Sequence, residues 1–351
     1  MKAARIHAYN QPVVLEDVPI PAIQPDEILV NVKACGMCRS DVQLVDGYFR
    51  PYADIKPPIT IGHEIVGVVS KIGVTVPKTA GFSEGDHVVV APGWGDGTCR
   101  HCQMGDTQIC PNVRWPGFGE YGGFAEYVPV PARYLIKVDK SLKFEELAPL
   151  TDAGVTPYRA LKKLRDAGAL GAGRTVAVLG VGGLGLYAVQ YAKLLGGGAK
   201  VVAIARNPDK LAIAKDYGAD HIISSRDKTV EQIADELEAA TGQRDLDAIV
   251  DCAGAEEMIK LGFGLLAISG HYADVGLAGD RIDVPLFPRV SREQVFHGSF
   301  WGNYNDIAEV LALMADGKIR HTLQVFSFDQ INEQLDLLRA GDIVGRAVMK
   351  F

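Results

Sequence analysis

The feature that most constrains the fold is a glycine-rich turn between a predicted strand and a predicted helix, "RTVAVLGVGGLGLYAVQ" at residues 174–190. Its G-x-G-x-x-G pattern is typical of a turn that binds a dinucleotide. Gly180 allows the tight turn, Gly182 lets the backbone approach a pyrophosphate, and Gly185 lets the helix pack against the sheet. Free N–H groups at the helix start attract negative charge. We therefore expect a dinucleotide site rather than a purely structural turn.

Strands and helices alternate along the chain after about residue 150. The stretches between the strands have helical periodicity, as in "PDKLAIAKDYG" at 208–218, which has Pro near its start and Gly at its end. This alternation predicts a doubly wound parallel sheet in an α/β fold. The predicted strands are 174–180, 199–205, 219–223, 246–252, 270–276 and 294–300.

The first 150 residues have a different pattern. Short alternating runs such as 27–34 and 86–92 are separated by Gly and Pro, which predicts an irregular, mostly antiparallel β domain. The last fifty residues contain helical segments and a terminal strand, 345–351. A chain of 351 residues is long enough for two domains.

The composition disfavours several classes of partner. A net charge of −7 and a pI near 5.7 argue against nucleic acid and anionic membranes. No apolar run reaches the roughly 18 residues that a membrane span needs. The first 20 residues alternate like a strand and lack the apolar core of a signal peptide. We expect a cytoplasmic protein with reduced thiols, which disfavours disulfides.

Three cysteines in "GDGTCRHCQMGDTQIC", residues 95–110, have the spacing of metal ligands. Cys99 and Cys102 form a C-x2-C pair, and Cys110 follows them. Asp96 stands three residues before Cys99 and offers a carboxylate as the fourth ligand, although "GDG" is also typical of a turn. Four protein ligands leave no open position, so such a metal would be structural.

Two further segments, "CGMCRSD" at 35–41 and "GHE" at 62–64, contain possible ligands. Cys35 and Cys38 are compatible with a redox pair or with small residues at a strand end. A single histidine such as His63 is more often structural than a ligand. Spacing alone therefore does not define a second metal site.

The chain resembles the medium-chain zinc-dependent alcohol dehydrogenase family over nearly its whole length. The resemblance implies a GroES-like, mostly-β catalytic domain at 1–152, a Rossmann domain at 153–300, and a return to the catalytic domain at 301–351. The matching segments are "GMCRSDV", "PITIGHEIVGVV", "GDHVVV", "GTCRHCQMGDTQIC", "GGFAEYV", "APLTDAGVTPYRAL", "TVAVLGVGGLGLYAVQYAKLLG" and "DYGAD".

The resemblance implies two zinc ions, one structural and one catalytic. The implied ligands of the catalytic ion are Cys38, His63 and Asp152, with a fourth position open to substrate. Many relatives have cysteine where this chain has Asp152, and a helix N-cap is the alternative role for that residue. Glu64 matches a residue that approaches the metal, and Asp41 matches the carboxylate that orients His63.

The resemblance also implies a hydride-transfer mechanism. Ser40 matches the hydroxyl that takes the alcohol proton. Relatives have a histidine three residues later, where this chain has Gln43, so the proton must leave by another route. Hydride passes between the substrate carbon and the nicotinamide. The other residues implied at the cofactor are Thr156 and Leu184 behind the nicotinamide ring, Arg39 and Arg346 at the pyrophosphate, and Gly180, Gly182, Gly183 and Gly185 in the turn.

The end of the second predicted strand of the parallel sheet indicates the cofactor. NAD-binding sheets place Asp or Glu there to hold the ribose 2′-hydroxyl. This chain has Ala205, followed by Arg206 and, one helical turn on, Lys210. The missing carboxylate and the nearby cations favour a 2′-phosphate, so we expect NADP(H) to be preferred and NAD(H) to be possible.

The substrate pocket implied by the resemblance is aromatic, although core packing remains an alternative for each ring. We expect a secondary alcohol, ketone or aromatic aldehyde as substrate. A polyol or sugar dehydrogenase, or a non-catalytic zinc protein that senses redox state through a bound cofactor, are the alternatives. The implied pocket residues are Tyr48, Phe49, Trp94, Trp115 and Trp301.

We also expect a homodimer or homotetramer. The resemblance implies that the parallel sheets of two copies join through an edge strand, and "RIDVPLF" at 281–287 is the predicted edge.

Overall fold

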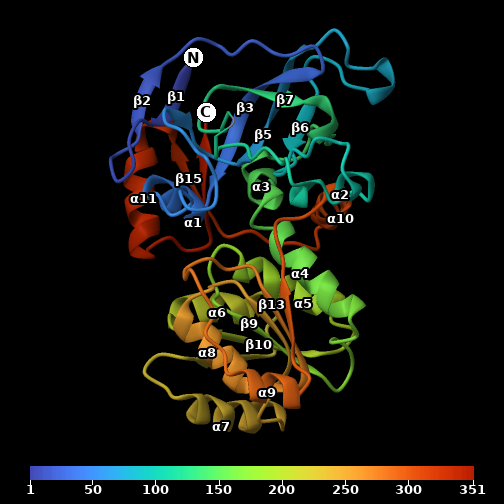
Figure 1. Ribbon diagram of the computed structural model, residues 1–351, viewed down its shortest axis with the longest axis vertical. Coiled ribbons are helices and arrows are strands. Elements are labelled where there is room, and N and C mark those ends of the chain that lie inside the picture. Colours follow the sequence, from blue (N-terminus) through green and yellow to red (C-terminus); the bar gives the residue numbers. More distant parts are fainter. Residues whose placement is uncertain (120) are drawn as a thin grey trace. The chain divides into compact units, whose positions relative to one another are not determined.

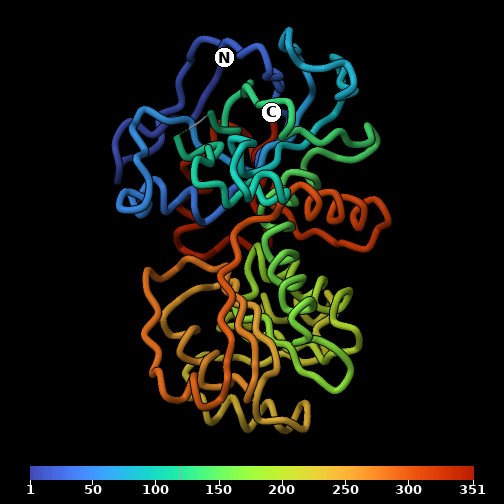
Figure 2. The backbone as a smooth tube through the Cα atoms, turned by 45° about the vertical axis from the view of Figure 1, so that its right-hand side comes forward, coloured from blue at the N-terminus to red at the C-terminus, as the bar shows by residue number. Residues whose placement is uncertain are grey.

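The computed structural model describes residues 1–119 and 121–351. The chain divides into two compact units (Figures 1 and 2). The first unit contains Met1–Asp152 and Gly302–Phe351, and the second contains Ala153–Trp301. In Figure 2 the red C-terminal segment accordingly belongs to the same unit as the blue N-terminal segment.

The second unit is built on a six-stranded sheet with the order β11-β10-β9-β12-β13-β14. Every pair of neighbouring strands is parallel, which confirms the expected α/β class. The strand order reverses between β9 and β12, which is where such sheets bind ligands at their carboxyl ends. The strands are β9 (Thr175–Leu179), β10 (Lys200–Ala205), β11 (His221–Ser224), β12 (Leu246–Asp251), β13 (Leu266–Asp274) and β14 (Val295–Gly298).

Helices connect these strands and bury apolar side chains against them. Strand β9 is buried along its whole length, as expected for a strand covered on both faces. One apolar cluster joins strand residues such as Ile204 and Ile249 to Leu237 and Ile259 on the helices. The helices are α4 (Val155–Asp166), α5 (Gly185–Leu195), α6 (Pro208–Asp216), α7 (Val230–Thr241), α8 (Glu256–Leu265) and α9 (Leu286–Ser291).

The predicted edge strand at 281–287 is wrong. Its last two residues, Leu286 and Phe287, begin helix α9, and the residues before them are irregular. Pro285 and Pro288 lack the N–H groups that a paired strand needs, which gives the physical reason. Among the described residues, β14 is the edge strand on this side of the sheet.

The first unit contains a seven-stranded sheet that is antiparallel except for the pair β15 and β16. C-terminal strand β16 pairs with β3, and Ala347 lies opposite Met37. The last residues therefore complete the sheet that the first residues began. The strands are β3 (Glu27–Met37), β5 (Glu64–Ile72), β6 (His87–Val90), β7 (Tyr127–Pro131), β8 (Leu135–Lys137), β15 (Leu323–Ser327) and β16 (Arg346–Lys350).

A smaller antiparallel sheet and several helices complete this unit. The sheet has the order β2-β1-β4, with β1 (Lys2–Ile6), β2 (Val14–Asp17) and β4 (Ile59–Thr60). In neither unit is any helix of the described chain long and apolar enough to cross a bilayer. The helices are α1 (Arg39–Val45), α2 (Arg100–Gln103), α3 (Phe144–Leu147), α10 (Tyr304–Ala315) and α11 (Ile331–Ala340).

Candidate active site and metal centres

Four buried side chains of the first unit form a cluster that could hold a metal ion. One ligand atom of each of Cys38, His63, Glu64 and Asp152 lies within 4.8 Å of the others. Strand register explains part of this arrangement, because Gly36 on β3 lies opposite Glu64 on β5. Cys38 follows β3 directly and His63 precedes β5, so the two side chains reach the same end of the sheet.

Asp152 ends a short 3-10 helix, Ala148–Thr151, and is only 5% exposed. The N-cap alternative for this residue is wrong. Helix α4 begins at Val155 with Gly154 as its cap, and no side chain makes the capping hydrogen bond. The carboxylate instead belongs to the buried cluster, where its Oδ2 lies 3.4 Å from Nε2 of His63.

Asp41 links two members of the cluster. Its Oδ2 accepts a 2.8 Å hydrogen bond from the backbone N–H of Cys38, and its Oδ1 lies 3.3 Å from Nδ1 of His63. Ser40, the second residue of α1, places its Oγ 3.4 Å from Nε2 of His63. Helix α1 therefore brings a hydroxyl and a carboxylate to the same imidazole, and a carboxylate beside the other ring nitrogen orients a histidine towards a metal.

The cluster is electrostatically unusual because so many acids are buried together. Burial opposes a charge on His63, but Asp41 and Asp152 outweigh it and raise the pKa of the imidazole well above its ordinary value. Burial raises the pKa of Glu64 to about 8, although the neighbouring Arg346 lowers it. Burial also acts to raise the pKa of Asp152, but His63 and Arg346 hold it below its usual range.

The donor set suits zinc. A thiol, an imidazole and a carboxylate are all zinc ligands, and three protein ligands are typical of a catalytic site. Divalent charge would also compensate the buried acids, which are costly to ionise without a cation. Cys38, His63 and Asp152 therefore fit the ion that the resemblance implies.

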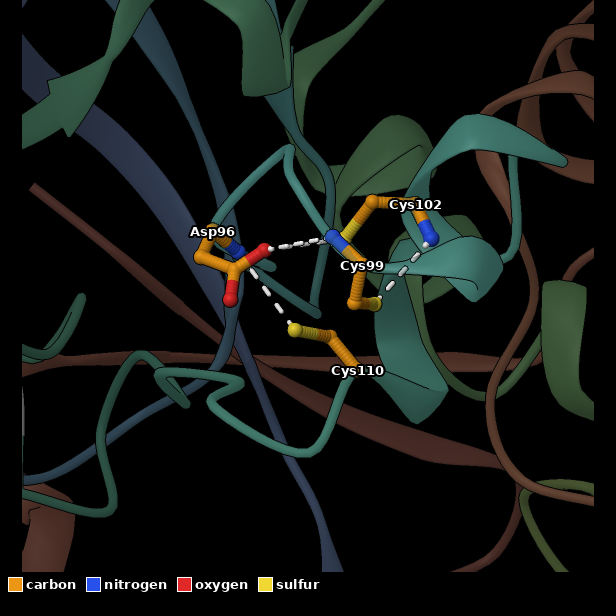
Figure 3. A group of neighbouring side chains, drawn as sticks. All are labelled: Asp96, Cys99, Cys102 and Cys110. Atoms are coloured by element: carbon orange, nitrogen blue, oxygen red, sulfur yellow. Dashed lines mark hydrogen bonds between the residues drawn. The ribbon is translucent and has the colours of Figure 1, made fainter.

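The second candidate centre consists of Asp96, Cys99, Cys102 and Cys110 (Figure 3). One ligand atom of each again lies within 4.8 Å of the others. Backbone N–H groups point at two of the sulfurs, from Cys102 to Cys99 at 3.4 Å and from Asp96 to Cys110 at 3.5 Å. Such bonds stabilise thiolates, which are the form that binds zinc. This donor set is closed, as in a structural site.

Asp96 also stabilises a turn, as its "GDG" context predicts. Its Oδ1 accepts hydrogen bonds from the N–H groups of Thr98 at 2.7 Å and Cys99 at 3.2 Å. Its Oδ2 accepts one from the side chain of Asn112 at 2.8 Å. These bonds hold the pKa of Asp96 well below its usual range. The turn and the ligand role are therefore compatible, because the ordered carboxylate remains beside the three sulfurs.

Aromatic rings extend from the buried cluster. The ring of Phe118 lies 5.1 Å from that of His63, centroid to centroid. Phe49 and Trp115 both meet Phe118 edge to face, at 5.2 and 6.1 Å, and Tyr48 meets Phe49 at 5.1 Å. Three of the predicted pocket residues are thus brought together beside His63. We call Tyr48, Phe49, Trp115 and Phe118 the aromatic wall.

Phe118 was missed from the sequence, although its neighbour carries a signal. Gly117 has a φ of 77°, and a Cβ there would lie 2.7 Å from the carbonyl oxygen of Gly62. Only glycine therefore allows this segment to approach the residue before His63 so closely. In the sequence, the only signal for the contact between Phe118 and His63 was the glycine that directly precedes Phe118.

The other two tryptophans make different contacts. Trp94 is 1% exposed, donates its indole N–H to the carbonyl of Ala91 at 2.9 Å, and packs under Arg114. Trp94 is therefore packed in the core of the first unit, and its role as a pocket wall stays a prediction. Trp301 belongs to the second unit, where its ring lies 4.5 Å from that of Phe300.

Arg346 lies in the interior of the first unit and is only 5% exposed. Its Nε donates to Oε2 of Glu64 at 3.1 Å, and its Nη2 donates to Oε1 of Glu64 and, at 3.1 Å, to Oδ2 of Asp152. The guanidinium is thus engaged with two carboxylates of the buried cluster, and a role at the cofactor pyrophosphate stays a prediction. Arg39 is exposed at the start of α1.

The glycine-rich turn of the second unit has the geometry that a dinucleotide requires. Gly180 has a φ of 80°, and a Cβ on Gly185 would lie 2.0 Å from the carbonyl oxygen of Gly180. A Cβ on Gly182 would meet no described atom within 4 Å, so this position faces open space. The turn follows β9, at the point where the strand order reverses. Gly183 and Leu184 lie in the same turn, and Thr156 is buried on α4.

The end of β10 lacks a carboxylate. Ala205 is the last residue of the strand, and Arg206 is exposed directly after it. Asn207 caps helix α6 by accepting hydrogen bonds from the N–H groups of Asp209 and Lys210. The side chains of Arg206 and Lys210 therefore emerge at the start of α6.

Two family descriptions match the chain: "Alcohol dehydrogenase GroES-like domain" at 24–140 and "Zinc-binding dehydrogenase" at 183–316. An NAD-dependent alcohol dehydrogenase of Sulfolobus acidocaldarius is 36% identical over 357 residues, covering 100% of this chain and 99% of the relative. A D-arabinose 1-dehydrogenase (NADP(+)) of Saccharolobus solfataricus is 33% identical, with coverages of 99% and 97%. The crystal structure of the alcohol dehydrogenase of Aeropyrum pernix matches with a TM-score of 0.93 at 36% identity, and each chain is covered completely.

This chain belongs to the medium-chain, zinc-dependent alcohol dehydrogenase family. It is therefore an oxidoreductase of the alcohol dehydrogenase class, as the resemblance implied. The expected combination of a GroES-like domain and a dinucleotide-binding parallel sheet is confirmed.

Proposed function

We propose that Cys38, His63 and Asp152 form the catalytic zinc centre, and that the aromatic wall beside His63 receives an apolar alcohol or carbonyl substrate. The observation that carries this proposal is the contact between a buried set of three zinc donors and a group of aromatic rings. When bound, zinc polarises a substrate oxygen and lowers the pKa of a bound hydroxyl, while nicotinamide exchanges hydride with the substrate carbon.

The chain's own residues supply orientation and proton transfer. Asp41 orients the imidazole of His63 electrostatically, with its Oδ1 3.3 Å from Nδ1, while Nε2 faces Asp152 at 3.4 Å. Ser40 Oγ lies 3.4 Å from that Nε2 and takes the alcohol proton. Gln43 cannot titrate, so the ribose hydroxyls of a bound cofactor and water would have to carry the proton on from Ser40 in place of a histidine.

The substrate is a secondary alcohol, a ketone or an aromatic aldehyde. Large rings favour apolar and aryl groups, because they bury such surface and stack with it. A polyol or sugar substrate needs convergent polar groups instead. The similarity to a D-arabinose 1-dehydrogenase supports a sugar as the alternative substrate. Activity on 1-phenylethanol compared with D-arabinose and sorbitol, followed by the absorbance of reduced nicotinamide, separates the two.

The cofactor proposal is a preference for NADP(H), with NAD(H) also accepted. It is supported by the absence of a carboxylate at Ala205 and by the exposed Arg206 beside it. A guanidinium binds a 2′-phosphate through paired, charge-assisted hydrogen bonds. The redox-sensor alternative differs in predicting cofactor binding without turnover on any substrate.

The chain is proposed to form a homodimer or homotetramer through the β14 edge of its parallel sheet. Four large apolar side chains near that edge are strongly exposed: Ile268, Leu286, Phe287 and Val290. Residues 268 and 286–290 lie on one side of the unit, since the N–H of Ser269 donates to the carbonyl of Arg292 at the end of α9. Exposed apolar patches of this kind mark protein interfaces.

Asp152→Ala tests the catalytic centre. The variant loses one of three ligands of an open site, so bound zinc should fall from two ions per chain to about one, and turnover should be lost while the fold is retained. Asp96 and its cysteines serve as the internal reference, since their zinc should remain. Two zinc ions and normal activity in the variant would exclude Asp152 as a ligand.

A further inference from the structure

Arg346 is held rigidly beside the buried cluster. It begins β16, and its backbone N–H donates to the carbonyl of Thr322 at 2.9 Å. The preceding Gly345 has a φ of 76°, and a Cβ there would lie 2.1 Å from the same carbonyl oxygen. The pairing of β16 with β3 sets the side chain next to the end of β3, where Cys38 follows. The guanidinium therefore points into the cluster because of the register of two strands.

Glu64 is likewise fixed by its neighbours. A Cβ on Gly36 would lie 1.7 Å from Oε2 of Glu64, so the glycine leaves the space that this carboxylate fills. Nε and Nη2 of Arg346 donate hydrogen bonds to the two carboxylate oxygens of Glu64. Bidentate pairs of this kind are strong and directional. Glu64 is thus kept on the guanidinium, although its oxygen is near enough to the other three donors to join them.

The charges of the metal ligands explain why an ion pair between Arg346 and Glu64 is needed. A zinc ion bound by the Cys38 thiolate, the Asp152 carboxylate and a neutral His63 has no net charge. Glu64, when ionised, adds a further buried anion, and the guanidinium of Arg346 lies in contact with it. Without that guanidinium, an ionised Glu64 would be drawn towards the metal, because one of its oxygens lies within 4.8 Å of the other three ligand atoms.

Asp152 adds a second requirement. A carboxylate offers two oxygens and can rotate or chelate, whereas a thiolate offers one atom. Nη2 of Arg346 donates to Oδ2 of Asp152 at 3.1 Å, on the oxygen that also faces His63. The guanidinium of Arg346 therefore restrains the rotation of the Asp152 carboxylate and also keeps the Glu64 carboxylate away from the metal position.

We propose that Arg346 is a positioning residue of this metal centre, which keeps Glu64 out of the coordination shell and fixes the orientation of Asp152. The inference rests on the proposed assignment of Cys38, His63 and Asp152 as metal ligands. It gives Arg346 a role in metal binding that does not depend on the cofactor.

Cobalt substitution tests this inference without measuring turnover. In Arg346→Gln, Glu64 should enter the coordination shell, so the visible spectrum of the Co²⁺-loaded enzyme should change to that of a higher coordination number. Retention of cobalt at the buried centre should weaken by roughly 10–100-fold, as for other residues that orient ligands. The double variant Glu64→Gln/Arg346→Gln should lose the higher coordination number, because the additional carboxylate is gone, and any remaining difference from the wild-type spectrum reports the freed rotation of Asp152.

Two further variants complete the design. Arg346→Lys keeps the charge but not the paired hydrogen bonds, so its spectrum should lie between those of wild type and Arg346→Gln. Arg165→Gln is the matched control, since Arg165 is an exposed arginine paired with Asp166. Circular dichroism and cobalt at the Asp96 centre report whether each variant is folded. If Arg346→Gln does not fold, Arg346→Lys decides the question by the same spectrum.

Different failures have different signatures. An unchanged cobalt spectrum in folded Arg346→Gln or Arg346→Lys, together with weaker binding of NADP(H) or NAD(H), would overturn the inference and make Arg346 a cofactor residue. A double variant that keeps the higher coordination number would also overturn it, because the added ligand would not be Glu64. Wild-type protein that takes up only one cobalt ion would instead contradict the proposed catalytic centre itself.

Discussion

The rings of Phe118 and His63 lie 5.1 Å apart, so an aromatic side chain packs directly on a proposed zinc ligand. Phe118 is 7% exposed and joins His63 to Phe49 and Trp115. This contact connects the chemistry of the buried cluster to the surface that a substrate would meet. The proposed substrate pocket thereby includes a residue that no motif identified.

Phe118→Leu should lower kcat/KM for 1-phenylethanol more than for 2-butanol. An aromatic pair contributes about 0.5–1.5 kcal/mol beyond its buried area, which corresponds to a loss of roughly 2–10-fold with the aryl substrate. Steady-state rates with both alcohols measure the difference, and 2-butanol serves as the control. Equal losses with both substrates would show that the ring acts only on the metal site or on stability.

Asp96 should act as a ligand of the cysteine centre. Asp96→Asn keeps an oxygen acceptor for the N–H groups of Thr98 and Cys99 but removes the charged ligand. Because structural zinc contributes directly to folding, this variant should lose zinc and thermal stability while its initial rate changes little. Asp96→Cys should retain zinc. Metal analysis and thermal unfolding decide the matter, and a collapse of initial rate at unchanged stability would contradict the structural role.

Wild type should have a higher kcat/KM with NADP(H) than with NAD(H). Ala205→Asp/Arg206→Val should reverse this preference, because it restores a carboxylate for the ribose hydroxyl and removes the proposed phosphate ligand. Loss of charge-assisted hydrogen bonds of about 1.5–3 kcal/mol predicts roughly 10–100-fold less efficiency with NADP(H). Arg226→Val, at another exposed arginine after a strand, is the control. A wild type that prefers NAD(H), unaltered by the exchange, would show that the strand end does not select the cofactor.

Stability should depend on pH through Asp274. This residue lies opposite Asp251 in the parallel pair β12 and β13, and burial together with the Asp251 charge raises its pKa from 3.8 to about 7. The folded protein therefore keeps a proton that the unfolded chain loses above its lower pKa. Stability contributed by this proton is fully present below the unfolded pKa and is lost as the pH rises to about 7.

Asp274→Asn removes this titration and keeps the side-chain shape. Between about pH 5 and about pH 8, the free energy of unfolding of the variant should fall less than that of wild type, by a difference on the order of 1–2 kcal/mol, and its thermal midpoint should fall less accordingly. Scanning calorimetry or thermal circular dichroism at both pH values measures it. Midpoints that move in parallel would mean that Asp274 titrates normally in the folded state.

The oligomer should depend on the exposed apolar side chains near β14. Light scattering at micromolar concentration should give two or four times the 37.7 kDa mass of one chain. Phe287→Lys places a charge where a side chain is 81% exposed, so it should weaken association without unfolding the unit. Tyr52→Lys, at another exposed ring, is the control. A wild-type mass of one chain would refute the proposed association.

The sequence by itself determined those features that depend on neighbouring residues. The six parallel strands, the turn at Gly180–Gly185 and the Cys99–Cys102 pair were all predicted, because periodicity, glycine spacing and ligand spacing act over short distances along the chain. Recognition of the family added Cys38, His63 and Asp152, which spacing alone had left undecided. The predicted edge at 281–287 was wrong because Pro285 within it and Pro288 directly after it lack the N–H groups that a paired strand needs.

Only the tertiary structure decided which distant residues meet. Arg346 reaches Asp152 across 194 positions in the chain, because β16 pairs with β3 in one particular register. Phe118 reaches His63 because Gly117 lets two backbones approach closely. Strand register and close backbone contact are set by the packing of the whole unit, and no local pattern of residues encodes them.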